Sequence, residues 1–265
     1  MSKPTEKEYW SDFYVQSSLA LAPSRIDVIT SLFCSEVEET FLLPESKRDI
    51  LEVGCGSALF SKLMAEKGYA VSCCDFSPAA LAAASKRLEG LAVNVFNADV
   101  RSLPIPDNSV DLVYCGGLLD VFEDPSPVFK EVLRVLRPQG LFIAVVPSKS
   151  FSIQVLADYF NSVVHTIKSL LGQPSIYWRK YRFNLKHATT KPEAFYLMSA
   201  SKCGFNDVFV SKGYPVPELS MPAALKGQYV RFIRTISPIL QGKIFSKNII
   251  FRVFGIYYYV VARKI

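Results

Sequence analysis

The stretch Asp49-Ile50-Leu51-Glu52-Val53-Gly54-Cys55-Gly56-Ser57-Ala58 decides the fold. It joins an apolar run typical of a short buried strand, an acid near the end of that run, and a glycine turn leading into a helix. The two glycines allow the backbone to approach a ligand without an intervening side chain. The amides that open the next helix offer hydrogen-bond donors and a positive dipole end. Together these features predict a nucleotide-type cofactor site.

The spacing of the glycines separates two classes of cofactor. A dinucleotide fingerprint requires a third glycine three residues after the second, a position held here by Leu59. The order acid-x-Gly-x-Gly, with Ala58 as a small residue in place of a third glycine, resembles the first motif of class I S-adenosylmethionine-dependent methyltransferases. This resemblance disfavours a dehydrogenase.

A second acid, Asp75, ends the next predicted strand, 21 residues after Gly54. A carboxylate at about this spacing can accept both hydrogen bonds from a ribose diol. Ser77 suits the N-cap of the following helix and Pro78 its first position. The resemblance implies that Asp75, Phe76 and Ser77 contact the cofactor.

The resemblance covers about residues 45–147 and assigns roles to two further motifs. After a third predicted strand over 92–97, it implies that Asp99 binds the adenine amino group and that Val100 packs on the ring. After the fourth strand, it implies that backbone groups line the donor pocket. The residues expected to bind S-adenosylmethionine are Tyr14, Glu52, Gly54, Cys55, Gly56, Ser57, Asp75, Phe76, Ser77, Asp99, Val100, Cys115 and Gly116.

The fold implied by the resemblance is an α/β, doubly wound, mostly parallel sheet of seven strands, in which strand seven is antiparallel. It is a Rossmann-like methyltransferase fold with helical insertions. The remaining predicted elements are helices over 26–41, 129–136 and 191–202, a turn over 137–140, and strands over 141–146, 206–211 and 256–263.

Within a single structural domain we distinguish three parts. Residues 1–45 form an N-terminal helical cap over the cofactor, with Ser24 placed to cap the helix. Residues 46–147 form the S-adenosylmethionine-binding half. Residues 148–265 contain acceptor-side insertions together with strands six and seven.

Composition narrows the class of protein. Half of the 265 residues are apolar, which is ample for a buried core. The six cysteines have no metal-ligand spacing, so we expect reduced thiols, no metal site and a cytoplasmic protein. The N-terminus is polar, unlike a secretory signal. No apolar run reaches the roughly 18 residues of a membrane span, so we expect a soluble protein.

Charge divides the chain unevenly. Residues 1–150 hold 14 Lys and Arg against 20 Asp and Glu, whereas residues 151–265 hold 16 against 4. The basic second half predicts an anionic partner: phosphate, carboxylate, nucleic acid or a lipid surface. A plainly solvated surface is the alternative.

Methyl transfer from a sulfonium is a direct displacement, so the protein must align the acceptor and exclude water. An amine needs no base, whereas a hydroxyl or an acidic carbon does. The candidate catalytic residues are His187, which precedes the last predicted helix, and Asp120, which follows strand four. Family members often carry a Glu-His pair where this chain has Asp120-Val121, so the role of that histidine does not transfer. A structural hydrogen bond is the alternative for Asp120.

The run from Tyr177 to Phe183 interleaves aromatic residues with cations, which suits a nucleotide or an aromatic acid. The alternative is an amphipathic segment that lies on the core with its cations in water. Packing is likewise the alternative for two N-terminal aromatic residues, Trp10 and Tyr14. The candidates for acceptor binding are Trp10, Tyr177, Trp178, Tyr181 and Arg182.

The leading hypothesis is an S-adenosylmethionine-dependent methyltransferase for a small-molecule acceptor that is anionic, aromatic or amphipathic. N-, O- and C-methylation all stay open. RNA or protein methylation through the basic C-terminal half is the second hypothesis, and a non-catalytic binding protein is the third. The asparagine-proline-proline-aromatic signature of DNA-base or glutamine methylation is missing after strand four, so no DNA partner is expected. The oligomeric state is not predicted.

The insertion over 213–254 is long for a connection between strands. Apolar spacing predicts a helix over 222–236, which Pro238 ends by forcing Ser237 out of helical geometry. A basic amphipathic helix here predicts a lid over an anionic or amphipathic acceptor. Peripheral membrane contact through 219–254 and a helix packed on the sheet edge are the alternatives.

Overall fold

The structure is a computed structural model of the 265-residue chain. It describes residues 25–41, 48–148, 152–172, 191–219, 223–242 and 249–265. Several predicted residues lie outside these ranges: Trp10, Tyr14, Ser24, Tyr177, Trp178, Tyr181, Arg182 and His187.

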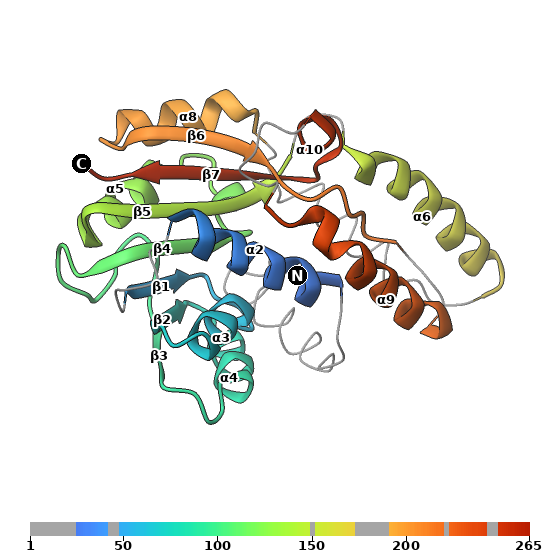
Figure 1. The fold of residues 1–265 in the computed structure, drawn as a ribbon, viewed down its shortest axis with the longest axis horizontal. Helices are drawn as coiled ribbons and strands as arrows, with labels where there is room; N and C mark the ends of the chain where they lie inside the picture. The colour runs from blue at the N-terminus through green and yellow to red at the C-terminus, as the bar shows by residue number, and fades with distance from the viewer. Residues whose placement is uncertain (1–24, 42–47, 149–151, 173–190, 220–222, 243–248) are drawn as a thin grey trace, which may run out of the picture.

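A seven-stranded sheet forms the centre of the molecule, in the order β3-β2-β1-β4-β5-β7-β6 (Figure 1). Strands β1 to β5 pair in parallel, and β7 runs antiparallel to both β5 and β6. This arrangement confirms the predicted fold class, including the antiparallel seventh strand. The strands are β1 (Asp49–Val53), β2 (Ala70–Asp75), β3 (Val93–Asn97), β4 (Val110–Gly116), β5 (Leu136–Pro147), β6 (Asn206–Lys212) and β7 (Tyr257–Arg263).

Helices cover both faces of the sheet (Figure 1). The helices of the cofactor half and the last helix before β6 are α2 (Arg25–Phe41), α3 (Leu59–Glu66), α4 (Pro78–Arg87), α5 (Ser126–Val135) and α8 (Glu193–Lys202). Phe33 of α2 and Phe60 of α3 share one core cluster, whereas Phe129 of α5 and Tyr196 of α8 share another. The sheet is therefore doubly wound, as predicted.

The predicted cap of α4 is present. Ser77 has extended backbone geometry and its Oγ accepts from the Ala80 amide at 3.4 Å, while Pro78 takes the first helical position. This start places the residues just before it, Asp75 and Phe76, at the end of β2. Local capping therefore fixes where the second acid stands.

The turn predicted over Arg137–Gly140 is wrong, since these residues belong to β5. The pairing of β4 with β5 shifts between Val110 and Leu112, and Gln139 has a φ of 66°. Extra residues are thus accommodated as a bulge inside the strand. Pro138 and Gly140 correctly indicated an irregular backbone, but the pairing of β4 with β5 continues on both sides of it.

The predicted end of the second-insertion helix is also wrong. Helix α9 runs from Ala223 to Leu240 with Pro238 inside it. A proline at this position removes the amide that would bond to the Arg234 carbonyl. The Ser237 hydroxyl donates to that carbonyl at 2.8 Å, so the oxygen keeps a partner and the helix continues.

The insertions add α6 (Ile153–Leu170), α9 and the short α10 (Ile249–Phe254), which lie beyond one end of the sheet (Figure 1). Residues 213–219, which lead from β6 toward α9, contact both α2 and α9. The buried Tyr214 hydroxyl lies 3.1 Å from Glu36 of α2, and the Tyr229 hydroxyl of α9 donates to Pro217 at 2.6 Å. The described part of the insertions is therefore fastened to the rest of the domain.

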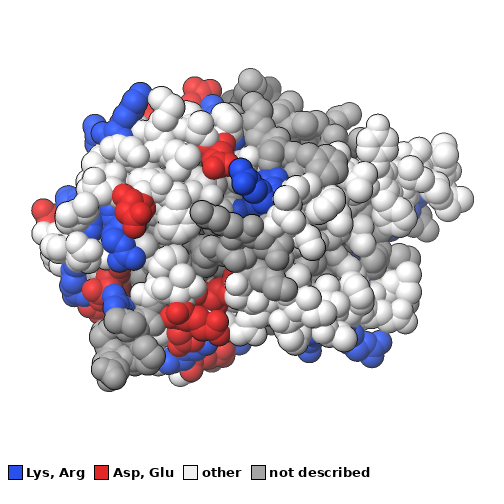
Figure 2. All heavy atoms as spheres, turned by 45° about the horizontal axis from the view of Figure 1, so that its top comes forward, with Lys and Arg blue, Asp and Glu red and all other residues white. Residues whose placement is uncertain are grey.

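Charged side chains are unevenly spread over the surface drawn in Figure 2. Acidic and basic side chains both gather toward the sheet, on the left. The right-hand end, where α6 and α9 lie in Figure 1, is mostly white with a few basic side chains. None of the described helices is long and apolar enough to cross a bilayer. All six cysteines are free thiols.

Candidate cofactor site

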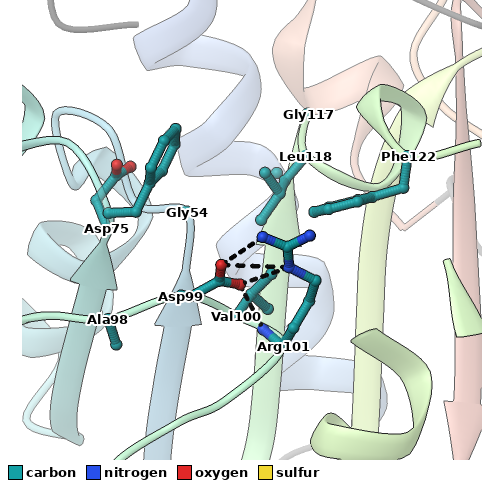
Figure 3. Close-up of a pocket in the computed structure, with 11 residues that line it drawn as sticks. Gly54, Asp75, Ala98, Asp99, Val100, Arg101, Gly117, Leu118 and Phe122 are labelled. Carbon is teal, nitrogen blue, oxygen red and sulfur yellow. Dashed lines mark hydrogen bonds and ion pairs between the residues drawn. The ribbon is translucent and has the colours of Figure 1, made fainter. Parts of the chain in front are cut away.

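A cavity opens at the carboxyl ends of the parallel strands, and about 660 Å³ of empty space, open solvent included, lies within it (Figure 3). Ligands of doubly wound sheets bind at this edge, where the strand order reverses. Here the reversal falls between β1 and β4, which are neighbours in the sheet. The lining residues are Gly54, Asp75, Phe76, Ala98, Asp99, Val100, Arg101, Gly116, Gly117, Leu118 and Phe122.

Asp75 lines the cavity and is held by two backbone amides. One oxygen, Oδ2, accepts from the Gly56 amide at 3.0 Å, and the other, Oδ1, accepts from the Ser77 amide at 2.9 Å. The side chain is buried, and this burial raises the pKa of the carboxyl group, opposed by the bonds from backbone amides. The carboxylate is thus fixed in position at the tip of β2.

The glycine loop is a closed turn. The Cys55 amide donates to the Cys74 carbonyl at 3.0 Å, and the Ala58 amide donates to the Cys55 carbonyl at 2.7 Å. The Gly56 amide is used by Asp75. From the sequence, the amides of this loop are expected to donate hydrogen bonds to the ligand. In the structure three of them instead hold the loop and the second acid together.

Gly54 is required at its position for two reasons. Its φ of 63° lies in the left-handed region, which side-chain-bearing residues adopt at a cost. A Cβ built there would lie 2.7 Å from Cδ2 of Leu118, in the chain that follows β4. The absent side chain therefore lets the β1 loop and the β4 loop meet at the floor of the cavity.

Glu52 lies behind the loop, outside the cavity lining. Its Oε2 accepts from both the amide and the hydroxyl of Ser61, at 2.9 and 2.5 Å, and so caps the start of α3. Burial raises the pKa of Glu52 to about 7, although the two bonds from Ser61 oppose that shift. The first acid of the motif thus positions the helix that follows the glycine loop.

Asp99 faces the cavity and is paired with Arg101 (Figure 3). The guanidinium donates to both carboxylate oxygens, with Nη2 at 2.6 Å from Oδ2 and Nε at 2.9 Å from Oδ1. The bonds from Arg101 hold the pKa of Asp99 below its usual range, against a smaller effect of burial. The guanidinium carbon also lies 5.7 Å from the centre of the Phe122 ring. Sequence analysis did not identify this arginine.

Asp120 lies in a short 3-10 turn, η1 (Leu119–Val121), between two residues that line the cavity. It is buried and is not part of the lining. Burial raises its pKa. Burial, and then the charge of Asp120, raises the pKa of the Cys115 thiol and of the Tyr196 phenol. The charge of Asp120 is therefore felt by one group in β4 and one in α8.

The structure brings six of the predicted cofactor residues into the cavity lining: Gly54, Asp75, Phe76, Asp99, Val100 and Gly116. Five others support this lining from behind or beside it: Glu52, Cys55, Gly56, Ser77 and Cys115. Ser57 is half-buried in the loop. The lining residues that sequence analysis missed are Ala98, Arg101, Gly117, Leu118 and Phe122.

The donor set fits S-adenosylmethionine. A carboxylate has about four acceptor sites, so Asp75 keeps capacity for hydroxyl groups beside the two backbone amides. Gly54, Gly116 and Gly117 leave the backbone accessible along the lining of the cavity. Four apolar side chains offer surface to a flat ring: Phe76, Val100, Leu118 and Phe122.

Comparison with known proteins agrees with this geometry. Residues 51–144 match the family described as "Methyltransferase domain". A Mycolicibacterium smegmatis protein, named a probable S-adenosylmethionine-dependent methyltransferase, is 32% identical over 102 residues, 38% of this chain and 39% of that protein. The ubiquinone biosynthesis O-methyltransferase of Xanthomonas oryzae pv. oryzae is 31% identical over 134 residues, 48% of this chain and 51% of the relative. The similarity thus spans about two fifths to one half of these relatives.

Solved structures share the fold over nearly the whole chain. An S-adenosylmethionine-dependent methyltransferase from Aquifex aeolicus superposes with a TM-score of 0.58 and 13% identity, covering 96% of this chain and 98% of that one. One from Archaeoglobus fulgidus gives 0.55 and 16%, covering 89% and 94%. The sheet order, the placed acids and the matched domain agree: residues 51–144 match a methyltransferase domain, and the chain is similar to class I S-adenosylmethionine-dependent methyltransferases.

Proposed function

We propose that the chain transfers a methyl group from S-adenosylmethionine to a small-molecule acceptor, with the donor bound in the cavity at the carboxyl ends of β1, β2, β3 and β4. One observation carries the proposal. Asp75 is buried, lines the cavity and is held by two backbone amides, so it is pre-oriented to accept hydrogen bonds. Because a pre-oriented acceptor loses little conformational freedom on binding, this acid suits a ribose diol.

Each lining group has a role in this proposal. Asp75 accepts from the ribose hydroxyls, and Asp99 accepts from the adenine amino group. The apolar lining covers the adenine ring, while Gly54 and Gly116 admit the amino-acid end of the donor close to the backbone. When bound, S-adenosylmethionine supplies a methyl group already activated on a sulfonium. The chain itself binds the donor, aligns the acceptor and excludes water.

Proton removal depends on the acceptor. We keep His187, outside the described residues, as the candidate base for a hydroxyl acceptor. Asp120 is the second candidate, although it is not part of the cavity lining. With an amine acceptor, His187→Ala and Asp120→Asn leave turnover nearly unchanged. With a hydroxyl acceptor, loss of the true base lowers turnover by about 10²–10⁴-fold.

The acceptor class is part of the proposal. Two relatives carry names that specify transfer to oxygen: the ubiquinone biosynthesis O-methyltransferase and the malonyl-[acyl-carrier protein] O-methyltransferase of Serratia marcescens, which is 28% identical over 114 residues, 43% of this chain and 44% of that protein. These names support an anionic or aromatic acceptor without deciding between them. Among the described lining residues the one cation, Arg101, is paired with Asp99, which gives no support to an RNA acceptor.

Calorimetry with S-adenosylhomocysteine, the demethylated product, tests donor binding. Asp75→Ala removes two charge-assisted hydrogen bonds to the ribose, so affinity falls at least about tenfold. Asp124→Ala is the matched control, because Asp124 makes the same bond to an amide two residues later, Ser126, at 3.0 Å and outside the lining. Unchanged affinity in Asp75→Ala, with a folded protein, contradicts the assignment.

A further inference from the structure

We propose that the surface formed by α6, α9 and α10 docks on an anionic lipid bilayer. The proposal goes beyond methyl transfer and does not depend on it, since none of the described residues of these helices lines the cofactor cavity. The lid over the acceptor, predicted from the sequence for this insertion, stays a prediction.

Helix α6 presents its apolar side to solvent. Tyr159 and Leu170 are 77% and 83% exposed, and Val163 is 57% exposed. The exposed side chains recur at spacings of three and four, so they form one stripe along the helix. The stripe includes Leu156, Tyr159, Phe160, Val163, Ile167 and Leu170. Contiguous apolar surface of this kind marks an interaction site.

The opposite side of α6 is polar and faces the protein. Asn161 and His165 are buried there. Nδ2 of Asn161 donates to the Glu218 carbonyl at 2.8 Å, and Oε1 of Gln154 accepts from the Glu218 amide at 2.7 Å. These bonds fix which side of the helix faces outward. Because these polar side chains bond to Glu218 on the inner side of α6, the apolar stripe on the other side faces outward.

Helices α9 and α10 extend the same kind of surface. Leu225, Phe232 and Ile239 of α9 are exposed and follow one another at intervals of seven residues. In α10, Ile249 is 74% exposed and Ile250 is also exposed. Both helices lie at the end of the molecule that carries α6 (Figure 1). Each of the three helices thus presents exposed apolar side chains.

Charge identifies the occupant as an anionic bilayer. Helix α9 carries exposed Lys226, Arg231 and Arg234 and no acid, and α10 carries exposed Arg252. The right-hand end of the face drawn in Figure 2 shows a few basic side chains among white ones, whereas charged side chains of both signs gather at the other end. Cations near an anionic membrane are attracted to its surface, and apolar side chains strengthen binding by entering the headgroup region. This mixture of exposed apolar residues and cations is typical of interfacial helices.

Flotation of the purified full chain with vesicles tests the proposal. We expect binding to phosphatidylcholine vesicles that contain phosphatidylglycerol to exceed binding to phosphatidylcholine alone by at least about tenfold, and to weaken at high salt. The double variant Phe160→Glu/Ile167→Glu lowers binding at least about tenfold. The double variant Arg231→Glu/Arg234→Glu lowers binding to the anionic vesicles toward the neutral level.

The control is Met198→Glu, because Met198 is 57% exposed and belongs to α8 rather than to one of the three helices. It keeps binding within about twofold of the unsubstituted chain. Three results would overturn the proposal. The first is no flotation, or equal flotation on both vesicle types. The second is unaltered binding in the α6 variant. The third is a lipid-free dimer that the α6 variant disrupts, since a second copy would then cover the surface.

Discussion

Phe129 in α5 and Phe160 in α6 both belong to amphipathic helices, yet Phe129 is fully buried and Phe160 is 52% exposed. Helix α5 lies on the sheet with its apolar side inward. Helix α6 lies beyond the sheet and turns a polar side inward, where Asn161 meets the Glu218 carbonyl. The comparison shows that apolar periodicity predicts a helix but does not say which partner its apolar side meets.

The same substitution in the two helices should give the largest contrast. Phe129→Ala removes a ring that packs against Phe142 and Phe205, so we expect it to lower the free energy of unfolding by about 3–5 kcal/mol. Phe160→Ala should change it by less than about 0.5 kcal/mol, because its ring is half exposed. Urea unfolding of the two variants checks this. Equal losses would mean that the α6 side chain is covered within the domain.

The cap of α3 gives the next largest effect. Glu52→Ala leaves the buried amide and hydroxyl of Ser61 without their acceptor, so we expect a loss of about 3 kcal/mol in unfolding free energy. Glu52→Gln keeps an acceptor oxygen and is the matched variant, with a much smaller loss. Thermal or urea unfolding at neutral pH compares the two. A loss as large in Glu52→Gln would show that charge, not hydrogen bonding, holds the cap.

The pH dependence of the free energy of unfolding should differ between the unsubstituted chain and Glu52→Gln. Burial raises the pKa of Glu52 from 4.5 to about 7, so the folded chain binds more protons than the unfolded chain between these values. Its contribution to stability is then full below about pH 4.5 and falls by up to about 3 kcal/mol as pH rises to 7. Glu52→Gln should lack this fall. Parallel pH profiles for both proteins would contradict the raised pKa.

The cofactor half could be predicted from the sequence because its signals are local. The glycine loop, Ser77 with Pro78, the acid that ends β2 and the acid that follows β3 each act within a few residues of themselves. Arg101 also carries a local signal, since a cation two residues after Asp99 can return to it. Leu118 carries none. It reaches Gly54 only because β1 and β4 are neighbours in the sheet.

The insertions could be predicted only as helices. The outward side of α6 depends on hydrogen bonds to Glu218, a residue about 60 positions away that no spacing connects to it. The continuation of α9 through Pro238 depends on one hydroxyl, that of Ser237. Low helix propensity reflects the amide that Pro238 lacks. That the Ser237 hydroxyl takes the place of this donor depends on side-chain geometry, which the sequence does not give.

That donor gives a smaller predicted effect. Ser237→Ala leaves the Arg234 carbonyl without a partner in an exposed helix, so we expect a loss of about 1 kcal/mol or less. Thr235→Ala is the control, because its hydroxyl bonds to the Arg231 carbonyl at 3.1 Å, which keeps a backbone donor inside the helix. Urea unfolding should give a lower free energy of unfolding for Ser237→Ala than for Thr235→Ala. The reverse order would mean that water replaces the hydroxyl.

The smallest effect is expected at the rim of the cofactor cavity. Arg101 and Asp99 are 53% and 43% exposed, so their ion pair stabilises the chain little. Arg101→Ala should change the affinity for S-adenosylhomocysteine by less than about threefold, as measured by calorimetry. A tenfold gain would show that Arg101 competes with adenine for Asp99. A tenfold loss would show that it contacts the ligand.

A crystal structure with S-adenosylhomocysteine tests the central claim most directly. We predict the ligand in the cavity at the ends of β1, β2, β3 and β4, with both ribose hydroxyls within hydrogen-bond distance of Asp75 and the adenine amino group beside Asp99. The backbone of the glycine loop should keep its bonds from Gly56 to Asp75. A ligand bound elsewhere, or a ribose that does not contact Asp75, would contradict the account.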